Sequence, residues 1–512
     1  MPVNQALGVI VTSSTPIFPD HRVNEPTTTP LSILDAKVAN FAPAAAFWLL
    51  PSHSSLSPSP LTASLKNALG HYPHWAGELS FVEDEKINPL DHRYRFRRLQ
   101  VQYGSPSDPG VVLVLASSRR PISSLIPDTP ESDVWDASQL PTSAFIPDEP
   151  LPPGINGPSA YIQVTQFPDA LAIGVKLAHG LSDAHTLVRF MHIWSFVHLH
   201  PSSALPDSLA PIFNPELLDK GALGDIDREY PDDGLLHKSA SLPVRRYDYW
   251  ASAEGCPPFM FDSTRIPQTI TVNRPLGTPM PWDEWEWQKP AGQYVVHFTG
   301  AEVHNIWSAA VAENENHLHS ARLSYLDALL AFVWALINRA RALDRDEREV
   351  YCITTLGMRG RLVPDTYVGS PIVLAAVKSS PSEDGLGNIA SKIRKTIDAF
   401  DNDSLGALLH DFAYEDTPQR VWNGFLGKRH VIFTSWLKLG MYDVQFMENE
   451  KPLYVSSIMP LCDGVVQVME APGRGREGKE KWWENGVDVS LQLEKEALER
   501  SVRDPSLRKY RC

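Results

Sequence analysis

The stretch from residue 159 to residue 200 constrains the fold more than any other part of this sequence. Residues 161–164 predict a strand, and residues 167–169 predict a turn around a proline. The apolar run 171–177 then predicts a second strand, buried on both faces. From Ala184 onward, apolar residues recur at helical spacing, namely Leu187, Phe190, Met191, Trp194 and Val197. The stretch therefore predicts two strands that lead through a short corner into a helix with a buried face.

The rest of the chain mixes helices and strands without the strict alternation of a βαβ fold. Leucines spaced four apart predict a helix at 60–71, and a strongly apolar stretch predicts another at 325–340 with Ser324 as its N-cap. A further helix is expected at 389–397. Strands are predicted at 351–356, 432–434, 453–458 and 465–469. We therefore expect an α+β (mixed α/β) fold, in which the charged last 40 residues form a peripheral helix or tail.

The length of 512 residues is enough for two large domains. Residues 201–290 hold 13 prolines, about twice the average density in this chain, which is typical of a long connection. We therefore expect an N-terminal domain at 1–200 that carries the corner, a proline-rich interdomain crossover at 201–290, and a C-terminal domain at 291–512.

Charge and cysteine content exclude several classes of function. The chain has 46 basic and 61 acidic side chains and a formal charge of −15, so a nucleic-acid partner is not expected. No apolar run is long enough to span a membrane, and the first residues lack the pattern of a secretory signal. The four cysteines are far apart and form no paired motif, so we expect no cysteine-bound metal and a reducing, cytoplasmic location.

His179 and Asp183 form the only His-x-x-x-Asp pattern among the 17 histidines, and they occupy the corner between strand and helix. A neutral imidazole can take a proton from a hydroxyl or an amine at physiological pH. A carboxylate four residues later can orient the imidazole or hold the corner. Two interpretations stay open at this point: a catalytic histidine, or a buried structural histidine beside an aspartate that only caps the helix at Ala184.

Short segments in a fixed order along the chain resemble the signatures of the BAHD superfamily of acyl-CoA-dependent acyltransferases. The corner is similar to the family's HxxxD signature. The other matching segments are residues 72–79, 324–334, 358–364, 367–369 and 434–436. The resemblance covers roughly residues 60–470, and it extends to fungal trichothecene acetyltransferases and plant hydroxycinnamoyl transferases.

The sequence departs from the family at its second signature, DFGWG. The matching stretch is 442–452, where only Asp443, Phe446 and the closing Lys451-Pro452 agree. Ala184 stands where the family often has glycine, and Ser370 stands where it usually has asparagine. These differences indicate a divergent member of the fungal type.

The resemblance implies a role for five residues. His179 would be the general base that takes the proton of the acceptor as it attacks the thioester. Asp183 would be a structural aspartate that points away from the substrate and pairs with Arg359. Thr434, through its hydroxyl, and Trp436, through its indole N–H, would donate hydrogen bonds to the developing oxyanion.

The same resemblance implies a fold, a co-substrate and partners. The fold would be two chloramphenicol-acetyltransferase-like domains, each a mixed sheet flanked by helices, with the site in a channel between them. Acyl-CoA would be a co-substrate rather than a permanently bound cofactor, no metal would be needed, and the acceptor would be a small molecule. Ser324, at a helix N-terminus, and Lys438 are the candidates for holding the phosphates of coenzyme A. The acidic surface favours a monomer.

We therefore predict an enzyme that transfers an acyl group from acyl-CoA to a hydroxyl of a small molecule of the secondary-metabolite type. Three alternatives remain. The acceptor could be an amine, the donor could be an acylated carrier protein, as in condensation domains, or the chain could be a catalytically inactive binding relative. Condensation domains usually carry paired histidines before the corner, and Ala178 stands there in this sequence.

Overall fold

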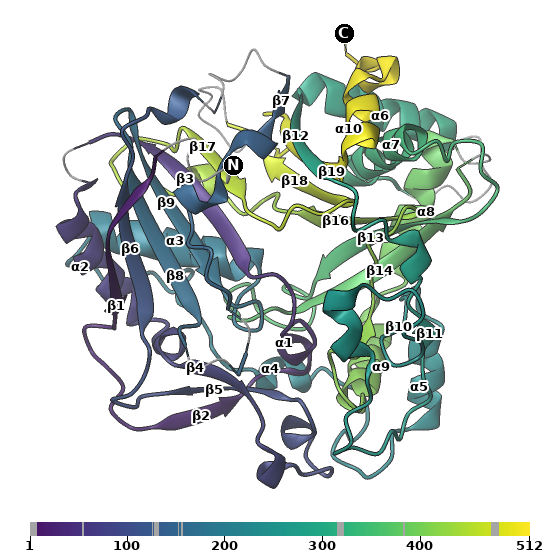
Figure 1. Cartoon of the computed structure of the whole chain (residues 1–512), viewed down its shortest axis with the longest axis horizontal. Coiled ribbons are helices and arrows are strands. Elements are labelled where there is room, and N and C mark those ends of the chain that lie inside the picture. The colour runs from purple at the N-terminus through teal and green to yellow at the C-terminus, as the bar shows by residue number, and fades with distance from the viewer. Residues whose placement is uncertain are drawn as a thin grey trace.

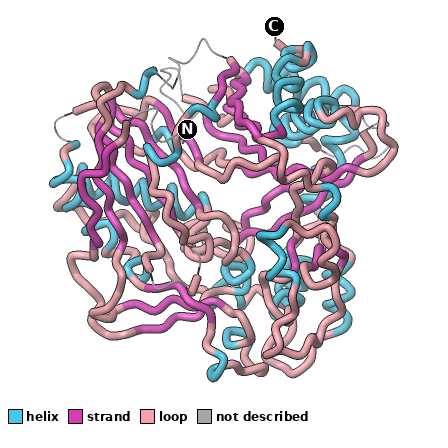
Figure 2. The backbone as a smooth tube through the Cα atoms, in the orientation of Figure 1, coloured by secondary structure: helices cyan, strands magenta, loops and turns pink. Residues whose placement is uncertain are grey.

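The structure is a computed structural model of the whole chain. It describes residues 8–53, 56–124, 126, 133–151, 153–154, 157–314, 322–381, 385–472 and 481–511. Two large sheets lie next to each other, one built mostly from the first part of the chain and the other mostly from its second part (Figure 1). Both sheets carry helices, and much of the lower part of the molecule in this view is loop (Figure 2).

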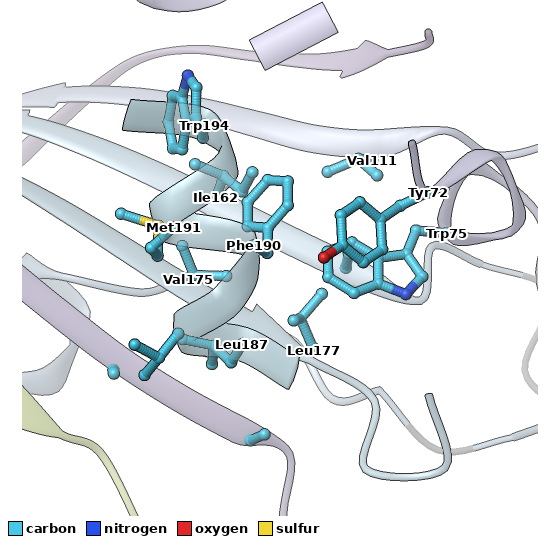
Figure 3. Packing of buried hydrophobic residues seen from close by; sticks show 14 of the residues in the cluster. Tyr72, Trp75, Val111, Ile162, Val175, Leu177, Leu187, Phe190, Met191 and Trp194 are labelled. Atoms are coloured by element: carbon cyan, nitrogen blue, oxygen red, sulfur yellow. The ribbon is translucent and has the colours of Figure 1, made fainter. Parts of the chain in front are cut away.

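The N-terminal sheet has six strands, and all neighbouring pairs are antiparallel except β6 and β8. Their order is β1 (Ile10–Ile17), β6 (Val111–Ser117), β8 (Ala160–Gln166), β9 (Ala170–Leu177), β3 (Ala44–Pro51) and β17 (Tyr454–Ser457). Helices α2 (Pro58–Leu69) and α3 (Ala184–Leu199) pack against one face of this sheet. Phe190, Met191 and Trp194 of α3 lie over the strands, and Tyr72 and Trp75 close the end of this core (Figure 3).

The C-terminal sheet has seven strands. Their order is β14 (Ile372–Ser379), β13 (Val350–Gly357), β16 (His430–Ser435), β18 (Val465–Glu470), β19 (Val487–Glu494), β12 (Ala291–Phe298) and β7 (Val134–Asp136). The helices that pack with its outer face are α6 (Gly300–Asn314), α7 (Tyr325–Ala340), α8 (Leu386–Asp398) and α10 (Lys495–Arg503). Val466 and Val468 of β18 lie in this outer core, so the alternate residues of β18 point to the inner face.

Each part of the chain contributes a strand to the other sheet. Strand β17 pairs with β3 in the N-terminal sheet, and β7 pairs with β12 in the C-terminal sheet. In addition, the indole N–H of Trp48 donates to the carbonyl of Met441 at 2.9 Å. Because each part of the chain has a strand paired within the other sheet, backbone hydrogen bonds tie the two parts of the chain together.

Smaller elements complete the lower part of the molecule. One three-stranded sheet contains β2 (Thr27–Pro30), β5 (Leu99–Tyr103) and β4 (Glu78–Phe81), and another contains β11 (Thr278–Pro279), β10 (Tyr247–Asp248) and β15 (Val421–Trp422). The remaining helices are α1 (Ile33–Lys37), α4 (Glu216–Asp219), α5 (Asp233–Ala240) and α9 (Asn402–Ala413). The proline-rich segment 201–290 contributes α4, α5, β10 and β11. It is tied to α9 by ion pairs from Arg246 and Arg274 to Asp411, at 2.7 and 2.5 Å.

The predicted strand, turn, strand, corner and helix are confirmed as β8, β9 and α3. The predicted helices at 60–71, 325–340 and 389–397 are also present, with Ser324 as the N-cap of α7. The expectation for the last 40 residues is wrong, because they include β19, an inner strand of the larger sheet. Its alternation of Val487, Val489, Leu491 and Leu493 with polar residues is a strand pattern that the high charge of the region obscured.

Candidate active site

The corner after β9 is held at its C-terminal end by a helix cap. Asp183 is the N-cap of α3, and its Oδ1 accepts from the backbone N–H of Thr186 at 2.9 Å. The remaining turn is closed by the N–H of Leu181, which donates to the carbonyl of Ala178 at 2.9 Å. The capping role of Asp183 is therefore real, and it occupies only one of the two carboxylate oxygens.

The other oxygen of Asp183 binds Arg359. Nη1 of Arg359 lies 2.6 Å from Oδ2, and both side chains are less than 10% exposed. Burial opposes ionisation of Asp183, but Arg359 and the helix cap outweigh it and hold the pKa of this carboxyl below its usual value. The same guanidinium donates to the hydroxyl of Thr186 and to the carbonyls of Tyr367 and Gly369. The predicted ion pair is thus confirmed, and it fastens the corner to the loop between β13 and β14.

His179 meets this loop through Ser370. The hydroxyl of Ser370 donates to the carbonyl of His179, and His179 Nδ1 lies 3.1 Å from the same hydroxyl oxygen. A serine hydroxyl has one proton, so in this arrangement Nδ1 must be the donor and Oγ the acceptor. The imidazole then carries its proton on Nδ1, and Nε2 keeps its lone pair. Burial lowers the pKa of His179, although Asp183 opposes this, so the ring is neutral at pH 7.

Ser370 is itself held by a buried carboxylate. Its backbone N–H donates to Asp35 Oδ1 at 2.6 Å, and the other carboxylate oxygen accepts from the hydroxyl of Ser32 at 2.6 Å. Asp35 is 1% exposed, and burial raises its pKa to about 7. Asp35 was not among the residues predicted from the sequence, although Ser32 and Asp35 form a capping box with a Ser-x-x-Asp pattern that could have indicated it.

Phe41 connects His179 to the inner face of the C-terminal sheet. Its ring meets the imidazole edge to face, with 5.5 Å between the ring centres. The same ring packs against a small apolar cluster on β13, β14 and β16, made of Ile353, Leu374, Ala376 and Ile432. His179 therefore lies at the boundary between the two sheets, with the ring of Phe41 between it and the cluster on the C-terminal sheet.

Thr434 lies on β16, and Trp436 is the first residue after this strand. The Thr434 hydroxyl is buried and has no hydrogen-bond partner among the described residues. Trp436 is 5% exposed, and its backbone N–H donates to Val468. Within the described part of the chain, no hydrogen bond joins either residue to His179; Thr434 instead shares the inner face of β16 with Ile432.

Ser324 and Lys438 lie apart from this cluster. The Ser324 hydroxyl accepts from the N–H of Asp327, and Arg394 binds both Ser324 and the Asp327 carboxylate at 2.8–3.1 Å. The N-terminus of α7 is therefore already satisfied by the protein's own charges, which disfavours Ser324 as a phosphate ligand. Lys438 is exposed and has a left-handed backbone with φ of 65°.

One group of side chains in the described residues has the composition of a metal site, Asp91, His92 and Asp227. The two ring nitrogens of His92 lie 2.9 Å from Asp227 and 3.2 Å from Asp219. Asp91 pairs with Arg93 at 2.9 Å. Burial lowers the pKa of His92, but its carboxylate partners outweigh this and raise it, so the arrangement is that of an ion-pair cluster around an imidazolium.

Comparison with known proteins identifies the family. A sequence model of the Transferase family matches residues 7–225 and 297–507, which make up most of the chain. This chain therefore belongs to that family, and to its BAHD type, as the motifs predicted.

One curated relative and two solved structures cover nearly the whole chain. "Acyltransferase AFT15-1" of Alternaria alternata is 26% identical and is matched over 98% of this chain and 97% of its own length. The structure of TRI101 of F. sporotrichioides with coenzyme A and T-2 is 17% identical, covers 94% of this chain and 99% of its own, and has a TM-score of 0.64. Vinorine synthase is 15% identical, with 96% of each chain covered and a TM-score of 0.61. The predicted fold, two chloramphenicol-acetyltransferase-like domains, is confirmed.

Proposed function

We propose that this protein transfers an acyl group from acyl-CoA to a hydroxyl of a small molecule, with His179 as the general base. The observation that carries the proposal is the pair of contacts between His179 and Ser370. They put the ring proton on Nδ1 and leave Nε2 as the basic atom of a half-buried, neutral imidazole. A base of this kind is what removal of a hydroxyl proton near pH 7 requires.

The reaction then needs few groups. Nε2 of His179 takes the proton of the acceptor hydroxyl as its oxygen attacks the thioester carbonyl, and the carbonyl oxygen becomes an oxyanion. The hydroxyl of Thr434 and the indole of Trp436 are the proposed donors to this oxyanion. When the tetrahedral intermediate collapses, the C–S bond breaks and the imidazolium returns its proton to the thiolate of coenzyme A. No enzyme-bound acyl intermediate is needed.

Asp183 and Arg359 act in this proposal by holding the corner, since their ion pair ties α3 to the loop that carries Ser370. Lys438 is the proposed contact for a phosphate of coenzyme A, because it is an exposed cation on the loop after β16. Ser324 fits this role less well, because Arg394 and Asp327 already occupy it.

Relatives support the choice of reaction and co-substrate. AFT15-1 is named an acyltransferase, and TRI101 was solved with coenzyme A and a small-molecule toxin.

We further propose a monomer in the cytoplasm. The three described cysteines are all free, as is usual in a reducing compartment. Among the described residues, no helix combines the length and the apolar character that crossing a bilayer requires.

The test combines binding and turnover. Purified protein is titrated with coenzyme A and with acetyl-, malonyl-, benzoyl- and long-chain acyl-CoA. A ligand at 100 times its Kd stabilises the fold by about 2.7 kcal/mol, which a thermal shift detects. Thiol release is then followed with pools of small alcohols and, separately, of amines. We expect one class of acyl-CoA to bind and alcohols to support release.

The variant His179→Ala should keep the thermal shift with acyl-CoA and lower turnover by roughly 10²–10⁴. His200→Ala, which removes an exposed imidazole at the other end of α3, is the matched control and should leave turnover unchanged. Release that requires amines would replace the O-acyl proposal by N-acylation. Absence of any acyl-CoA binding would reject the CoA-dependent reaction in favour of a carrier-protein donor or an inactive relative.

A further inference from the structure

Three neighbouring strands of the C-terminal sheet carry a row of polar residues on their inner face. The strands are the neighbours β16, β18 and β19 (Figure 1), in which Thr434 is in register with Gln467 and Gln467 with Ser490. Val466 and Val468, on either side of Gln467, lie in the core beneath the helices of the outer face. Side chains alternate along a strand, so Gln467 must point to the inner face, toward the N-terminal part of the molecule.

Gln467 is buried without a partner. It is 1% exposed, and neither its Oε1 nor its Nε2 hydrogen-bonds to any residue that the structure describes. The hydroxyl of Thr434, beside it in the row, is also buried and has no partner within the described part of the chain. Ser490, on the other side, accepts from Gln293 at 2.9 Å instead. Buried amides are nearly always hydrogen-bonded at both ends, so two adjacent unpaired groups indicate that something outside the chain completes them.

This row lies close to the proposed active site. Ile432, two residues before Thr434 on the same face of β16, packs against the same small apolar cluster as Phe41, whose ring contacts His179. Met469, two residues after Gln467 on the same face of β18, packs in the core of the N-terminal sheet. The amide of Gln467 is therefore enclosed between the two sheets, on the wall that faces the half of the molecule containing His179.

We infer that Gln467, beside Thr434 in the row, binds a neutral part of a ligand that both donates and accepts hydrogen bonds. Nε2 of the amide offers a donor and Oε1 an acceptor, so a hydroxyl of the ligand, or the N–H of one secondary amide and the carbonyl of the next, satisfies both. A carboxylate cannot donate to Oε1, and an ammonium cannot accept from Nε2. The inference rests on the proposed function in one respect: the ligand is one of its two substrates. The group belongs either to the amide-containing pantetheine arm of coenzyme A or to the acceptor.

The first measurement needs no ligand. Gln467→Leu removes two unpaired buried polar atoms and keeps an apolar side chain of similar size, so the melting temperature of the free protein should rise by about 2 °C. Gln492→Leu is the matched control. Gln492 is also 1% exposed and lies on the same face of β19, but its Oε1 accepts from the N–H of Cys462 at 3.1 Å. The control variant should therefore lower the melting temperature.

The second measurement identifies the source of the group. Thermal shifts are recorded with coenzyme A and with adenosine 3′,5′-bisphosphate, which lacks the pantetheine arm. If the arm binds Gln467, Gln467→Leu weakens binding of coenzyme A by about tenfold and leaves the bisphosphate unchanged. If the acceptor binds there, both affinities stay unchanged and the KM for the acceptor alcohol rises by about tenfold.

The inference is wrong if Gln467→Leu lowers the melting temperature as Gln492→Leu does, because Gln467 is then paired within the protein. It is also wrong if the variant changes neither the affinity for coenzyme A nor the KM of the acceptor. Failure of the proposed function has a different signature, since wild-type protein would then bind no coenzyme A while the two glutamine variants still differ in melting temperature.

Discussion

The two walls of the proposed site differ in whether their buried polar groups are hydrogen-bonded within the protein. On one wall, where the corner after β9 meets the loop between β13 and β14, His179, Asp183 and Arg359 have hydrogen-bond partners, and Ser370 joins them to Asp35. On the other wall, the inner face of β16 and β18 buries a hydroxyl and an amide that have no partners among the residues that the structure describes. The first wall is complete before a substrate arrives, and the second wall is completed by the substrate.

This difference follows from what each wall must do. A general base works only if its tautomer and position are set in advance, so the residues around His179 stabilise one arrangement. A binding wall must instead keep donors and acceptors available for a ligand, at a cost in stability of about 1–3 kcal/mol for each unpaired group. We therefore expect loss of the buried ion pair of the first wall to lower the free energy of unfolding strongly. Loss of a single hydrogen bond, such as the one from His179 to Ser370, should have a smaller effect on kcat.

Asp183→Asn should have the largest effect on stability. The amide cannot neutralise Arg359, which is 7% exposed in its side chain, so the variant leaves a buried cation without its counter-ion. Loss of one partner of a buried pair costs about 3–5 kcal/mol. Urea denaturation measures this as a lower free energy of unfolding.

Asp365→Asn is the matched control for that prediction. Asp365 also pairs with an arginine, Arg189, at 2.8 Å, but its carboxylate is 66% exposed. Exposed pairs contribute about 0–1 kcal/mol, so this variant should unfold close to wild type. If Asp183→Asn unfolds like the control and only slows turnover, its structural role is incorrect.

His74→Leu tests another buried imidazole, which differs from His179 in having no hydrogen-bond partner among the described residues. His74 is fully buried and stacks on Phe213, and both ring nitrogens lack hydrogen bonds within the described residues. Burial lowers its pKa from 6.5 to about 3, so the folded state keeps the ring neutral while the unfolded chain takes up a proton. The contribution to stability is complete above pH 6.5 and is lost as the pH falls from 6.5 toward 3.

Between pH 7 and pH 5, this linkage removes about 2 kcal/mol of stability from the wild type and none from His74→Leu. The difference between the two free energies of unfolding should therefore shift by about 2 kcal/mol in favour of His74→Leu between pH 7 and pH 5, and it should stay constant between pH 7.5 and 8.5. A wild type and variant that lose stability equally down to pH 5 would show that His74 is protonated in the folded protein.

Ser370→Ala should have the smallest of these effects. Without the hydroxyl, Nδ1 loses its acceptor and the preference for the reactive tautomer weakens, which we expect to lower kcat by about tenfold and leave the KM for acyl-CoA unchanged. Ser370→Asn, which restores the usual residue of the family and an acceptor oxygen, should recover part of kcat. A higher KM with unchanged kcat would mean that Ser370 contacts substrate instead.

Much of the fold could be predicted because its signals are local. The corner follows from the apolar run of β9, the Asp183 cap and the helical spacing in α3, all between Ala170 and Leu199. Strand β19 was missed because its alternating pattern lies in a charged region, and its burial depends on β12 and β18, which come from elsewhere in the chain.

The sequence by itself determined the family, the mixed fold, the position of His179 and the partner of Asp183, since short motifs carry all of these. Tertiary structure alone decided that Ser370, 191 residues away, faces Nδ1, that Asp35 holds Ser370, and that Gln467 has no partner among the described residues. The physical reason is that a hydrogen bond needs two groups within about 3 Å of each other. Only the packing of the two sheets brings distant segments so close or leaves a buried group unpaired.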